Sequence, residues 1–483
     1  MPPRTSRPRP VTLSVPAGLA GPIASIIEHI KTFQTSAGSG RVDFAEAEAR
    51  LGSLLADTEG NALAAMLGAL DPASERIEVA GLPYRRMDID VSESYTGVRG
   101  TARVQRGLYR QEGVRNGPTI VPMELLAGIV LGRYTPCAAK VSAVLAAEMP
   151  SRSADLVCRS AGILPHSRAA QERLGVELGA RWEALRPEAE AELVAEMELP
   201  ESIVAASVAV DRISLAMAEP RTPTSEDVAN GIKHPTDVNY RMAFVGAVTL
   251  YDKEGDPVST VRYAHLPEGG ASEMEASFSR DLASLLARRS GLRIVTLADG
   301  AHDMQGILDR ATANVPVAAK LVDYWHLVEH LGQAIGATDR YVADVLGDWK
   351  EDLLHDDAAI DRIEVTLRAW EREYAKGACP PELHSALTYI SNHRERLRYA
   401  TPRAAGLPIG SGTVEATGKA IVQVRMKRPG ARWRPAGAQA IMGLRALATS
   451  APGRWDAAVR RVLDGFRAHV KKKESPRKVA KNA

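Results

Sequence analysis

The sequence predicts a protein of the α+β class that is built from several domains. At 483 residues the chain is roughly two to four times as long as a typical domain. Segments with the apolar alternation of strands stand between segments with the apolar spacing of helices. A third observation is a strongly basic stretch near the C-terminal end, which indicates a region suited to a polyanionic partner.

The first 187 residues predict a region of helices with a small sheet. Residues 1–16 are rich in Pro and Arg and predict a disordered arm. Apolar spacing predicts a helical unit over 17–75, and β-branched residues between Gly-containing breaks predict a small β segment over 76–115. Residues 116–187 return to helical spacing, including a predicted helix over MELLAGIVLGRY (123–134). We expect this N-terminal region to bind DNA because of the motif at its end.

That motif is the stretch SADLVCRSAGILPHSRAAQERL (153–174), which has the pattern of a helix-turn-helix. Arg168 and Gln171 lie near the start of its second helix, where readers of the major groove carry their base-contacting side chains. We therefore predict that both residues contact DNA. An ordinary helix pair of a bundle is the alternative, since it has the same pattern.

Residues 200–325 predict a mixed sheet flanked by helices. The acidic segment before them (188–201) predicts a solvated linker helix. Three successive strands are expected first, and then strands alternate with helices. The predicted strands are IVAASVAVDRISLAM (203–217), YRMAFVGAVTLYD (240–252), PVSTVRYAHLPE (257–268), LRIVTLADG (292–300) and VAAKLVDYWH (317–326). Three antiparallel strands followed by this alternation are the order of an RNase H-like fold.

The pattern is helical throughout residues 326–400. This length exceeds any ordinary connection inside a sheet domain, so we interpret the segment as a helical insertion. The last part of the RNase H-like core is then predicted over 401–450, with a long helix over 413–428. Residues 451–483 predict a basic C-terminal tail.

The basic charge is concentrated after residue 400. Residues 401–483 contain 18 Lys or Arg, but only four Asp or Glu. Each phosphate neutralised by such a stretch releases counterions, so nucleic acid is the expected partner. The predicted DNA contacts here are Lys419, Arg425, Lys427, Arg428, Arg432 and Arg434. Trp433 either stacks on an unpaired base or packs in the core.

Three carboxylates occupy positions that the predicted fold brings together. Asp211 lies within the first apolar strand, where an unpaired charge is costly unless it binds a metal. Asp299 follows a central strand, and Glu415 lies in the first turn of a helix opened by GSG. Three oxygen donors without His or Cys suit Mg²⁺ or Mn²⁺. We therefore predict that these residues are catalytic and that they bind two such ions.

The segment PIGSGTVEATGKAIVQVRMKRPGARWRPAGAQAIMGLRAL (408–447) resembles the C-terminal signature of bacterial insertion-sequence transposases of the ISKra group, which are related to Mutator-like elements. IVTLADGAHD (294–303) is similar to the family's second-Asp segment. DYWHLVEHL (323–331) resembles its Asp-x-x-His motif, here Asp323 and His326. The first Asp departs from the family pattern, because Asp211 is followed by Arg212 where relatives have Gly, and this leaves Asp227 and Asp237 as alternatives.

The resemblance implies a DDE transposase with an RNase H-like core and a helical insertion before the Glu. It implies two Mg²⁺ ions, cleavage and strand transfer at the terminal inverted repeats of a mobile element, a target DNA and a homo-oligomer on double-stranded DNA. Asp323 and His326 would then belong to the catalytic site. For His326 we expect a role beside the metal, either orienting a carboxylate or contacting a phosphate, and the alternative is simple packing.

Two other functions fit parts of the pattern. A transposase-derived DNA-binding or regulatory protein would bind DNA without catalysis, and an RNase H-like nuclease would cut without joining. No apolar run approaches the roughly 20 residues of a membrane span, and three Cys are too few for a disulfide framework. We therefore expect a cytoplasmic, nucleoid-associated bacterial protein without a membrane partner.

Overall fold

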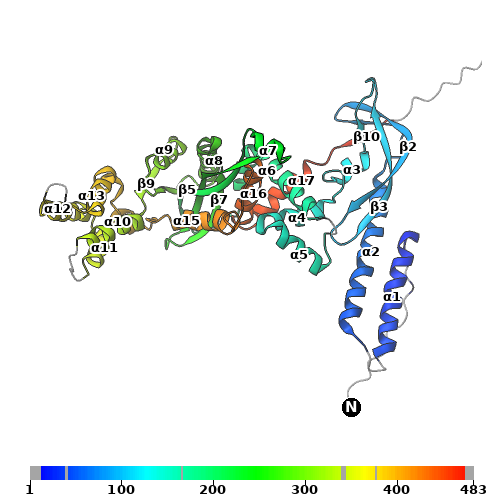
Figure 1. Cartoon of the computed structure of the whole chain (residues 1–483), viewed down its shortest axis with the longest axis horizontal. Coiled ribbons are helices and arrows are strands. Elements are labelled where there is room, and N and C mark those ends of the chain that lie inside the picture. Colours follow the sequence, from blue (N-terminus) through cyan, green and yellow to red (C-terminus); the bar gives the residue numbers. More distant parts are fainter. Residues whose placement is uncertain are drawn as a thin grey trace, which may run out of the picture. The chain divides into compact units, whose positions relative to one another are not determined.

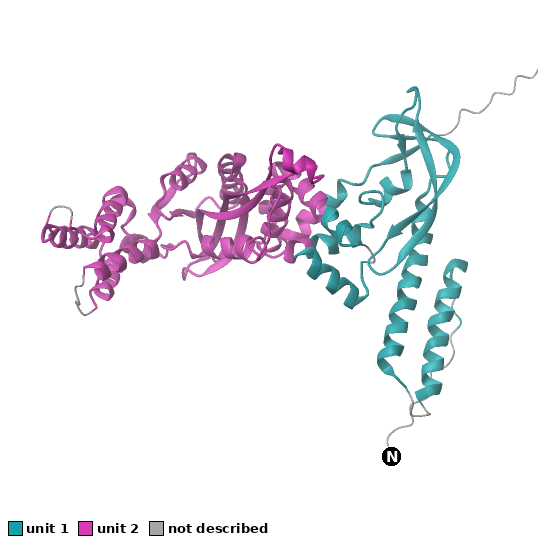
Figure 2. Ribbon diagram, viewed as in Figure 1, with its two compact units in different colours: residues 1–145, 150–174, 461–483 teal, residues 146–149, 175–460 magenta. Residues whose placement is uncertain are grey.

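The structure is a computed structural model, and its chain divides into two compact units (Figure 2). It describes residues 12, 14–37, 42–164, 167–338, 344–375 and 378–473. Unit 1 comprises residues 1–145, 150–174 and 461–483, and unit 2 comprises residues 146–149 and 175–460. Most of the predicted N-terminal arm lies outside the described residues.

Unit 1 begins with two long helices that lie side by side (Figure 1). Helix α1 spans Ala17–Ala37 and α2 spans Phe44–Leu70, which agrees with the predicted helical unit. The carboxylate of Asp43 caps α2 by accepting a hydrogen bond from the Glu46 N–H at 3.1 Å.

A five-stranded sheet follows in unit 1, in the order β10-β1-β2-β3-β4. Its strands are β1 (Arg76–Val79), β2 (Leu82–Thr96), β3 (Thr101–Gln111), β4 (Thr119–Ile120) and β10 (Val470–Lys473). Residues 470–473, which belong to the predicted basic tail, form a strand that pairs antiparallel with β1. Lys473 lies 2.7 Å from Glu78 of β1, so complementary charge joins the two strands.

The remaining helices of this region begin where Pro or a turn permits. They are α3 (Pro122–Ala127), α4 (Pro136–Glu148), α5 (Ser151–Ala161) and α6 (Arg168–Glu196). The helix predicted over 123–134 ends early, because Gly128 adopts the left-handed conformation that terminates helices, with φ of 68°.

Unit 2 contains a mixed five-stranded sheet in the order β7-β6-β5-β8-β9. The strands are β5 (Ile203–Pro220), β6 (Thr236–Asp252), β7 (Pro257–His265), β8 (Arg293–Ala298) and β9 (Val317–Val322). The first three are antiparallel, whereas β8 runs parallel to β5 and β9 parallel to β8. The predicted succession of strands is therefore present. The last strand ends four residues earlier than predicted, because Asp323 starts a helix.

Helices cover both faces of this sheet. On one face, α8 (Pro267–Arg288) and α9 (His302–Ala311) bury Phe278 and Met304 against Val208. The other face packs against α10 (Tyr324–Ala337), α15 (Gly412–Gly418) and α16 (Pro435–Ala448). From Ala205 onward, even-numbered and odd-numbered residues of β5 supply the two cores, as the alternation of a strand requires; the register shift between Ile203 and Ala205 reverses this order at the start of the strand.

The segment between β9 and α15 is helical, as predicted for residues 326–400. It contains α10, α11 (Val345–His355), α12 (Ala359–Arg372), α13 (Pro381–His393) and α14 (Ala400–Ala404). Trp349 and Trp370 stack at 5.5 Å inside this segment, with α11 and α12 contributing one ring each. The same apolar cluster continues into the sheet.

Helix α6 differs from the prediction of a solvated acidic linker. It continues without interruption through Pro187 to Glu196, and Glu190 within it is buried. Gly179 on α6 and Gly443 on α16 permit close packing there, since a Cβ at either position would collide with the facing helix. Glu190 is the one acid of the predicted linker that is buried, because α8, distant in sequence, covers it; the other acids of 188–201 are exposed, as predicted.

Among the described residues, no helix combines the length and the apolar character needed to cross a membrane.

Candidate active site

Asp211 lies on β5, and Asp299 directly follows β8, the parallel strand beside β5. The last registered pair between β5 and β8 is Ala209 with Leu297, and each Asp stands two residues further along its chain. Residues two apart on a strand point to the same face. Both carboxylates therefore belong to the face that Ala209 and Leu297 share, at the carboxyl end of β8.

The electrostatic environment of Asp211 reflects this arrangement. Burial raises the pKa of the half-buried Asp211, and the nearby Asp299 carboxylate raises it further. The Arg212 N–H donates a hydrogen bond to Asp211 at 2.6 Å, and this bond and the nearby His326 lower the pKa again. The Arg212 guanidinium itself pairs with Asp303, at 2.6 Å. The charge of Asp211 thus meets a second carboxylate, a histidine and the charge of Arg212, which also lowers its pKa.

Gly300 and Tyr389 fix the chain around Asp299. Gly300 has a φ of 98°, which disfavours any side chain, and a Cβ there would lie 3.0 Å from the Tyr389 hydroxyl. That hydroxyl donates to the backbone oxygen of Asp299 at 2.7 Å. A helix of the insertion, α13, therefore holds the end of β8. Sequence reasoning missed Tyr389, and its only signal was the Gly after the Asp.

His326 lies in the first turn of α10, close enough to Asp211 to affect its pKa. Its Nδ1 atom is buried and has no hydrogen-bond partner within the described part of the chain. A buried ring nitrogen without a partner is unusual. The Nδ1 atom of His326 can therefore still donate or accept a hydrogen bond near the two carboxylates. The predicted proximity to the site agrees with this placement.

Glu415 projects from the helix that crosses the same face. A Cβ at Gly418 of α15 would contact Ile213 and Val245 at 3.8 and 3.7 Å, so the helix packs on β5 and β6. The Glu415 side chain itself is exposed and lies 2.7 Å from the Lys419 ammonium. Throughout the residues that the structure describes, no three His, Cys, Asp or Glu side chains gather closely enough to hold a metal ion. Asp211 and Asp299 are brought together, and Glu415 is turned toward Lys419.

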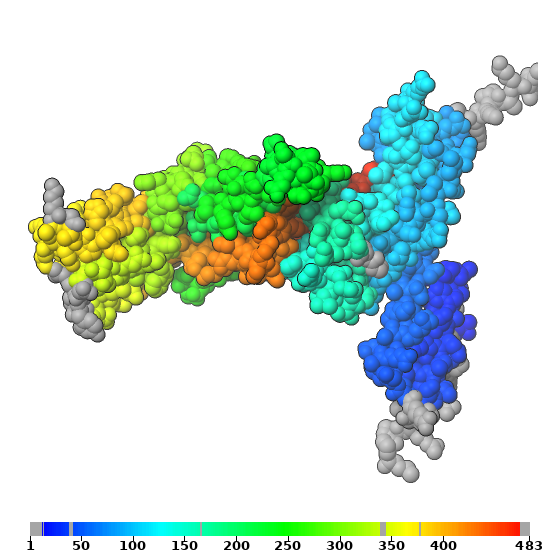
Figure 3. All heavy atoms as spheres, in the orientation of Figure 1, coloured from blue at the N-terminus to red at the C-terminus, as the bar shows by residue number. Residues whose placement is uncertain are grey.

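The helix predicted over 413–428 is shorter than expected. α15 ends at Gly418, and Lys419–Gln423 form a π-helical turn in which the Val424 N–H donates to the Lys419 oxygen at 3.0 Å. Such turns insert an extra residue and are frequent at functional sites. Figure 3 shows that this segment, in orange, lies on the surface of unit 2.

The extra residue changes which basic side chains face outward. Arg425 is buried, donates to the Ala146 oxygen at 3.0 Å and lies over the Trp433 ring at 5.1 Å. Burial lowers the pKa of Arg425 to about 10. The prediction that Arg425 contacts DNA is therefore wrong for this arrangement. Trp433 donates to the Met426 oxygen and packs against the core, as its second interpretation expected.

The other predicted DNA contacts divide in the same way. Gln171 is buried and donates to the Ser142 oxygen at 2.7 Å, so this prediction is also wrong and the residue packs between helices. The side chains that are exposed are those of Arg168, Lys419, Lys427, Arg428, Arg432 and Arg434.

The two alternatives for the first carboxylate are structural. Asp227 forms a capping box with Thr224 at the start of α7 (Ser225–Ala229) and pairs with Arg221. This pairing lowers the pKa of Asp227. Asp237 lies 3.0 Å from the same guanidinium. Arg221 forms ion pairs with both carboxylates. The arginine next to Asp211, Arg212, forms its ion pair with Asp303 instead.

Asp323, predicted as catalytic, is buried and its carboxylate contacts backbone N–H groups. One oxygen accepts from Trp325 and His326, and the other accepts from Ser411. The residue is a helix cap and a link to the segment before α15.

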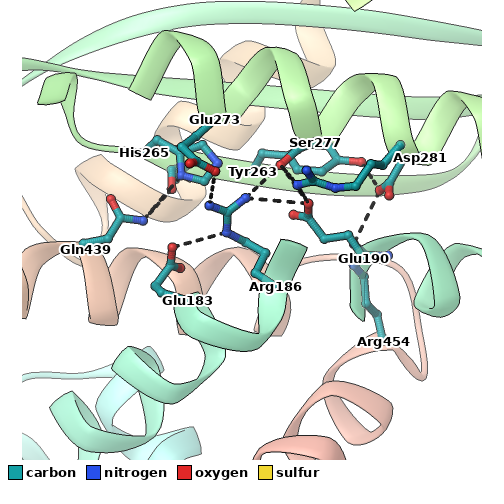
Figure 4. A network of polar contacts seen from close by, with 12 residues as sticks. Glu183, Arg186, Glu190, Tyr263, His265, Glu273, Ser277, Asp281, Gln439 and Arg454 are labelled. Carbon is teal, nitrogen blue, oxygen red and sulfur yellow. Dashed lines mark hydrogen bonds and ion pairs between the residues drawn. The ribbon is translucent and has the colours of Figure 1, made fainter. Parts of the chain in front are cut away.

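A second group of acids in unit 2 surrounds two buried carboxylates, those of Glu190 and Asp281 (Figure 4). Glu190 of α6 accepts hydrogen bonds from Arg280 at 2.7 Å and from Ser277 at 2.8 Å, and lies 3.6 Å from Arg186. Arg186 also contacts Glu183 at 3.2 Å and Glu273 at 2.8 Å. Helices α6 and α8 are joined by these pairs.

The same network continues toward α17 (Arg454–Asp464), where Asp281 lies 3.5 Å from Arg454 and accepts from Tyr263. Burial raises the pKa of Asp281 and of Glu183 to about 7, and lowers that of His265 to about 3. We refer to the residues labelled in Figure 4, together with Arg280, as the buried network.

Comparison with known proteins gives little. No protein-family model matches the chain, and no curated protein matches it. A solved structure titled "Drosophila P element transposase strand transfer complex" is similar over 68% of this chain and 90% of that chain, with 10% identity and a TM-score of 0.24. A similarity at that TM-score and identity carries no argument about fold or function.

Proposed function

We propose that the protein is a metal-dependent DNA transposase with an RNase H-like core. The observation that carries the proposal is the pair Asp211, on β5, and Asp299, directly after the neighbouring parallel strand β8, which lie close enough for one to raise the pKa of the other. Three antiparallel strands followed by two parallel ones support the RNase H-like assignment. The resemblance of residues 408–447 to ISKra-group transposases supplies the reaction class.

The two carboxylates suit a hard divalent cation. They offer only oxygen ligands, which Mg²⁺ and Mn²⁺ prefer, and a cation between them would offset the repulsion that raises the pKa of Asp211. Asp211, Asp299 and Glu415 would hold two such ions. When bound, the ions would activate a water or a DNA 3′-hydroxyl and stabilise the leaving oxygen of an in-line displacement.

Glu415 has to leave Lys419 in order to join the pair. An exposed ion pair of this i,i+4 kind is worth only about 0.3–0.5 kcal/mol. A DNA phosphate that neutralises Lys419 would therefore free Glu415 at little cost. DNA binding and assembly of the carboxylate triad would be coupled in this way, and the triad would complete only on DNA.

The exposed basic residues that follow Glu415 are the proposed DNA surface. Lys427, Arg428, Arg432 and Arg434 are exposed, and each phosphate contact would strengthen binding by counterion release. The partners we propose are terminal inverted repeats and a target DNA. Strand transfer joins two ends of an element, so we propose that a homo-oligomer binds both ends. The reaction would take place on the nucleoid in the bacterial cytoplasm.

The test uses the purified chain, a duplex carrying the inverted repeats that flank its gene, and Mg²⁺. We predict that Glu415→Gln lowers the cleavage rate at least ~10³-fold, equivalent to about 4 kcal/mol of barrier, while DNA binding persists. Glu382→Gln is the matched control, because Glu382 is also exposed in the first turn of a helix, α13. It should leave cleavage unchanged.

Three results would contradict the proposal. Equal cleavage by wild type and Glu415→Gln would remove Glu415 from the site. Binding of the repeats without Mg²⁺-dependent cleavage would indicate a regulatory DNA-binding protein. Cutting without joining, at the same rate on duplexes of any terminal sequence, would indicate an RNase H-like nuclease.

A further inference from the structure

Asp323 lies where three segments of the candidate site meet. It follows β9 directly, and its backbone N–H donates to the Ala298 oxygen at 2.9 Å. Ala298 is the residue before Asp299, so this bond ties Asp323 to the end of β8. Only 3% of Asp323 is exposed, which makes its hydrogen bonds costly to break.

The first carboxylate oxygen of Asp323 fixes the start of α10. It accepts hydrogen bonds from the N–H groups of Trp325 at 2.7 Å and His326 at 3.1 Å. An acid at this position satisfies N–H groups that the helix leaves unpaired and complements the helix dipole. The backbone of His326 is thereby held beside Asp211, whose pKa it influences.

The second oxygen of Asp323 fixes the segment that leads to Glu415. It accepts a hydrogen bond from the N–H of Ser411, the residue that precedes α15. The next N–H, that of Tyr324, donates to the Ile409 oxygen at 3.1 Å, so the two segments are joined by two bonds in succession. Helix α15 begins one residue after this link, and Glu415 lies in its first turn.

We propose that Asp323 is a positioning residue, which sets Asp299, His326 and Glu415 relative to one another without binding metal or DNA. Both oxygens of its carboxylate are directed at backbone N–H groups, and bonds to a charged acceptor are about twice as strong as neutral ones. The role of Asp323 in catalysis rests on the proposed function. The hydrogen-bonded link between the start of α10 and the segment before α15 does not depend on that function.

Asp323→Asn separates the two halves of this role. An amide has one acceptor oxygen, and that oxygen will face the two N–H groups of α10 rather than the single N–H of Ser411. The amide NH₂ then opposes the Ser411 N–H, donor against donor, while Asn still caps the helix well. We expect amide hydrogen exchange in peptides covering 409–415 to accelerate about tenfold or more, with peptides covering 325–330 unchanged.

Asp43→Asn is the matched control, since Asp43 caps α2 through one hydrogen bond and links to no second segment of the described chain. It should leave exchange at 409–415 as in wild type. Wild-type exchange at 409–415 in Asp323→Asn would overturn the inference. So would an equal increase at 325–330, because that result means general loosening instead of a lost link.

The catalytic side of the role is tested by titrating Mn²⁺ in the presence of the repeat duplex. Asp323→Asn should weaken Mn²⁺ binding about tenfold or more in a chain with Glu415, and add no further loss in a Glu415→Gln chain. Additive losses would contradict a role through Glu415. If Asp211→Asn binds Mn²⁺ as wild type does, the proposed function fails, and the exchange result on Asp323 still stands or falls by itself.

Discussion

Unit 2 contains two groups of acidic side chains that differ in their contacts with guanidinium groups. In the buried network, guanidinium groups meet the acids: Glu190 lies against Arg186 and Arg280, and Asp281 lies against Arg454. At the carboxyl end of β8, Asp211 and Asp299 adjoin each other, and the neighbouring Arg212 is paired with Asp303 instead. Guanidinium groups contact the acids of the first group directly, whereas Arg212 lowers the pKa of Asp211 without pairing with it, since its guanidinium pairs with Asp303.

The comparison teaches how to distinguish a structural acid from a candidate ligand. A buried carboxylate persists when an internal cation compensates the cost of desolvation, and removing either partner then harms folding. Two adjoining half-buried carboxylates that are only partly compensated raise the free energy of the site, and a bound cation lowers it. The predictions below contrast these two behaviours, and all six Trp lie within residues 175–460, so intrinsic fluorescence follows unit 2.

The largest effect on stability is expected from Glu190→Gln. Removing this charge takes the shared partner from the buried Arg186 and the partly buried Arg280, and Arg186 keeps only Glu183 and Glu273, so we expect the free energy of unfolding to fall by about 3 kcal/mol. Urea unfolding followed by Trp fluorescence measures it. Glu188→Gln, an exposed neighbour on the same helix, should change stability by less than about 0.5 kcal/mol. Equal effects of the two variants would show that the network is not structural.

A smaller effect is expected from Glu183→Gln, and it depends on pH. Burial raises the pKa of Glu183 from 4.5 to about 7 in the folded protein. The stabilisation of the neutral form is complete below pH 4.5 and is lost as the pH rises to about 7. Over that range we expect the stability of wild type, measured relative to Glu183→Gln, to fall by about 3 kcal/mol.

The difference between the two proteins is the quantity to measure, because other groups titrate in the same range. Asp281 acts in the same direction as Glu183, since its pKa is raised to about 7. His265 acts in the opposite direction, because its pKa is lowered to about 3 and its contribution is lost as the pH falls. A difference that stays constant between pH 4.5 and 7 would contradict the assignment to Glu183.

The sheet of unit 2 was predictable from sequence because each strand contains an apolar run that is bounded by a turn or a helix signal. The same runs placed Asp211 inside one strand and Asp299 after another, and the parallel register of β5 and β8 makes them neighbours. A local pattern was sufficient in these cases, since period and boundaries determine the position of a residue along a strand.

Burial of polar side chains could not be predicted in this way. In the sequence, Arg425 is one of several basic residues in a basic segment. In the structure its guanidinium donates to a backbone oxygen 279 positions away. Glu190 stands in an acidic run and is enclosed by α8, and residues 470–473 become a strand by pairing with β1. Tyr389 holds Asp299 from a helix 90 positions away in sequence. Such contacts depend on tertiary structure, which composition and spacing do not encode locally.

The smallest change in the free energy of unfolding is expected for Asp211→Asn, and its response to Mg²⁺ distinguishes the two acid groups most directly. Burial and Asp299 raise the pKa of Asp211, so its ionised form is penalised at neutral pH and Asp211→Asn should be at least as stable as wild type without metal. Added Mg²⁺ should then stabilise wild type by about 1.4 kcal/mol at ten times its Kd, and leave Asp211→Asn unchanged. Glu183→Gln, whose acid belongs to the buried network, should gain as much from Mg²⁺ as wild type does. Urea unfolding with and without Mg²⁺, at constant ionic strength, measures all three proteins. If Mg²⁺ stabilises wild type and Asp211→Asn equally, the ion binds elsewhere, and the contrast between the two groups of carboxylates does not hold.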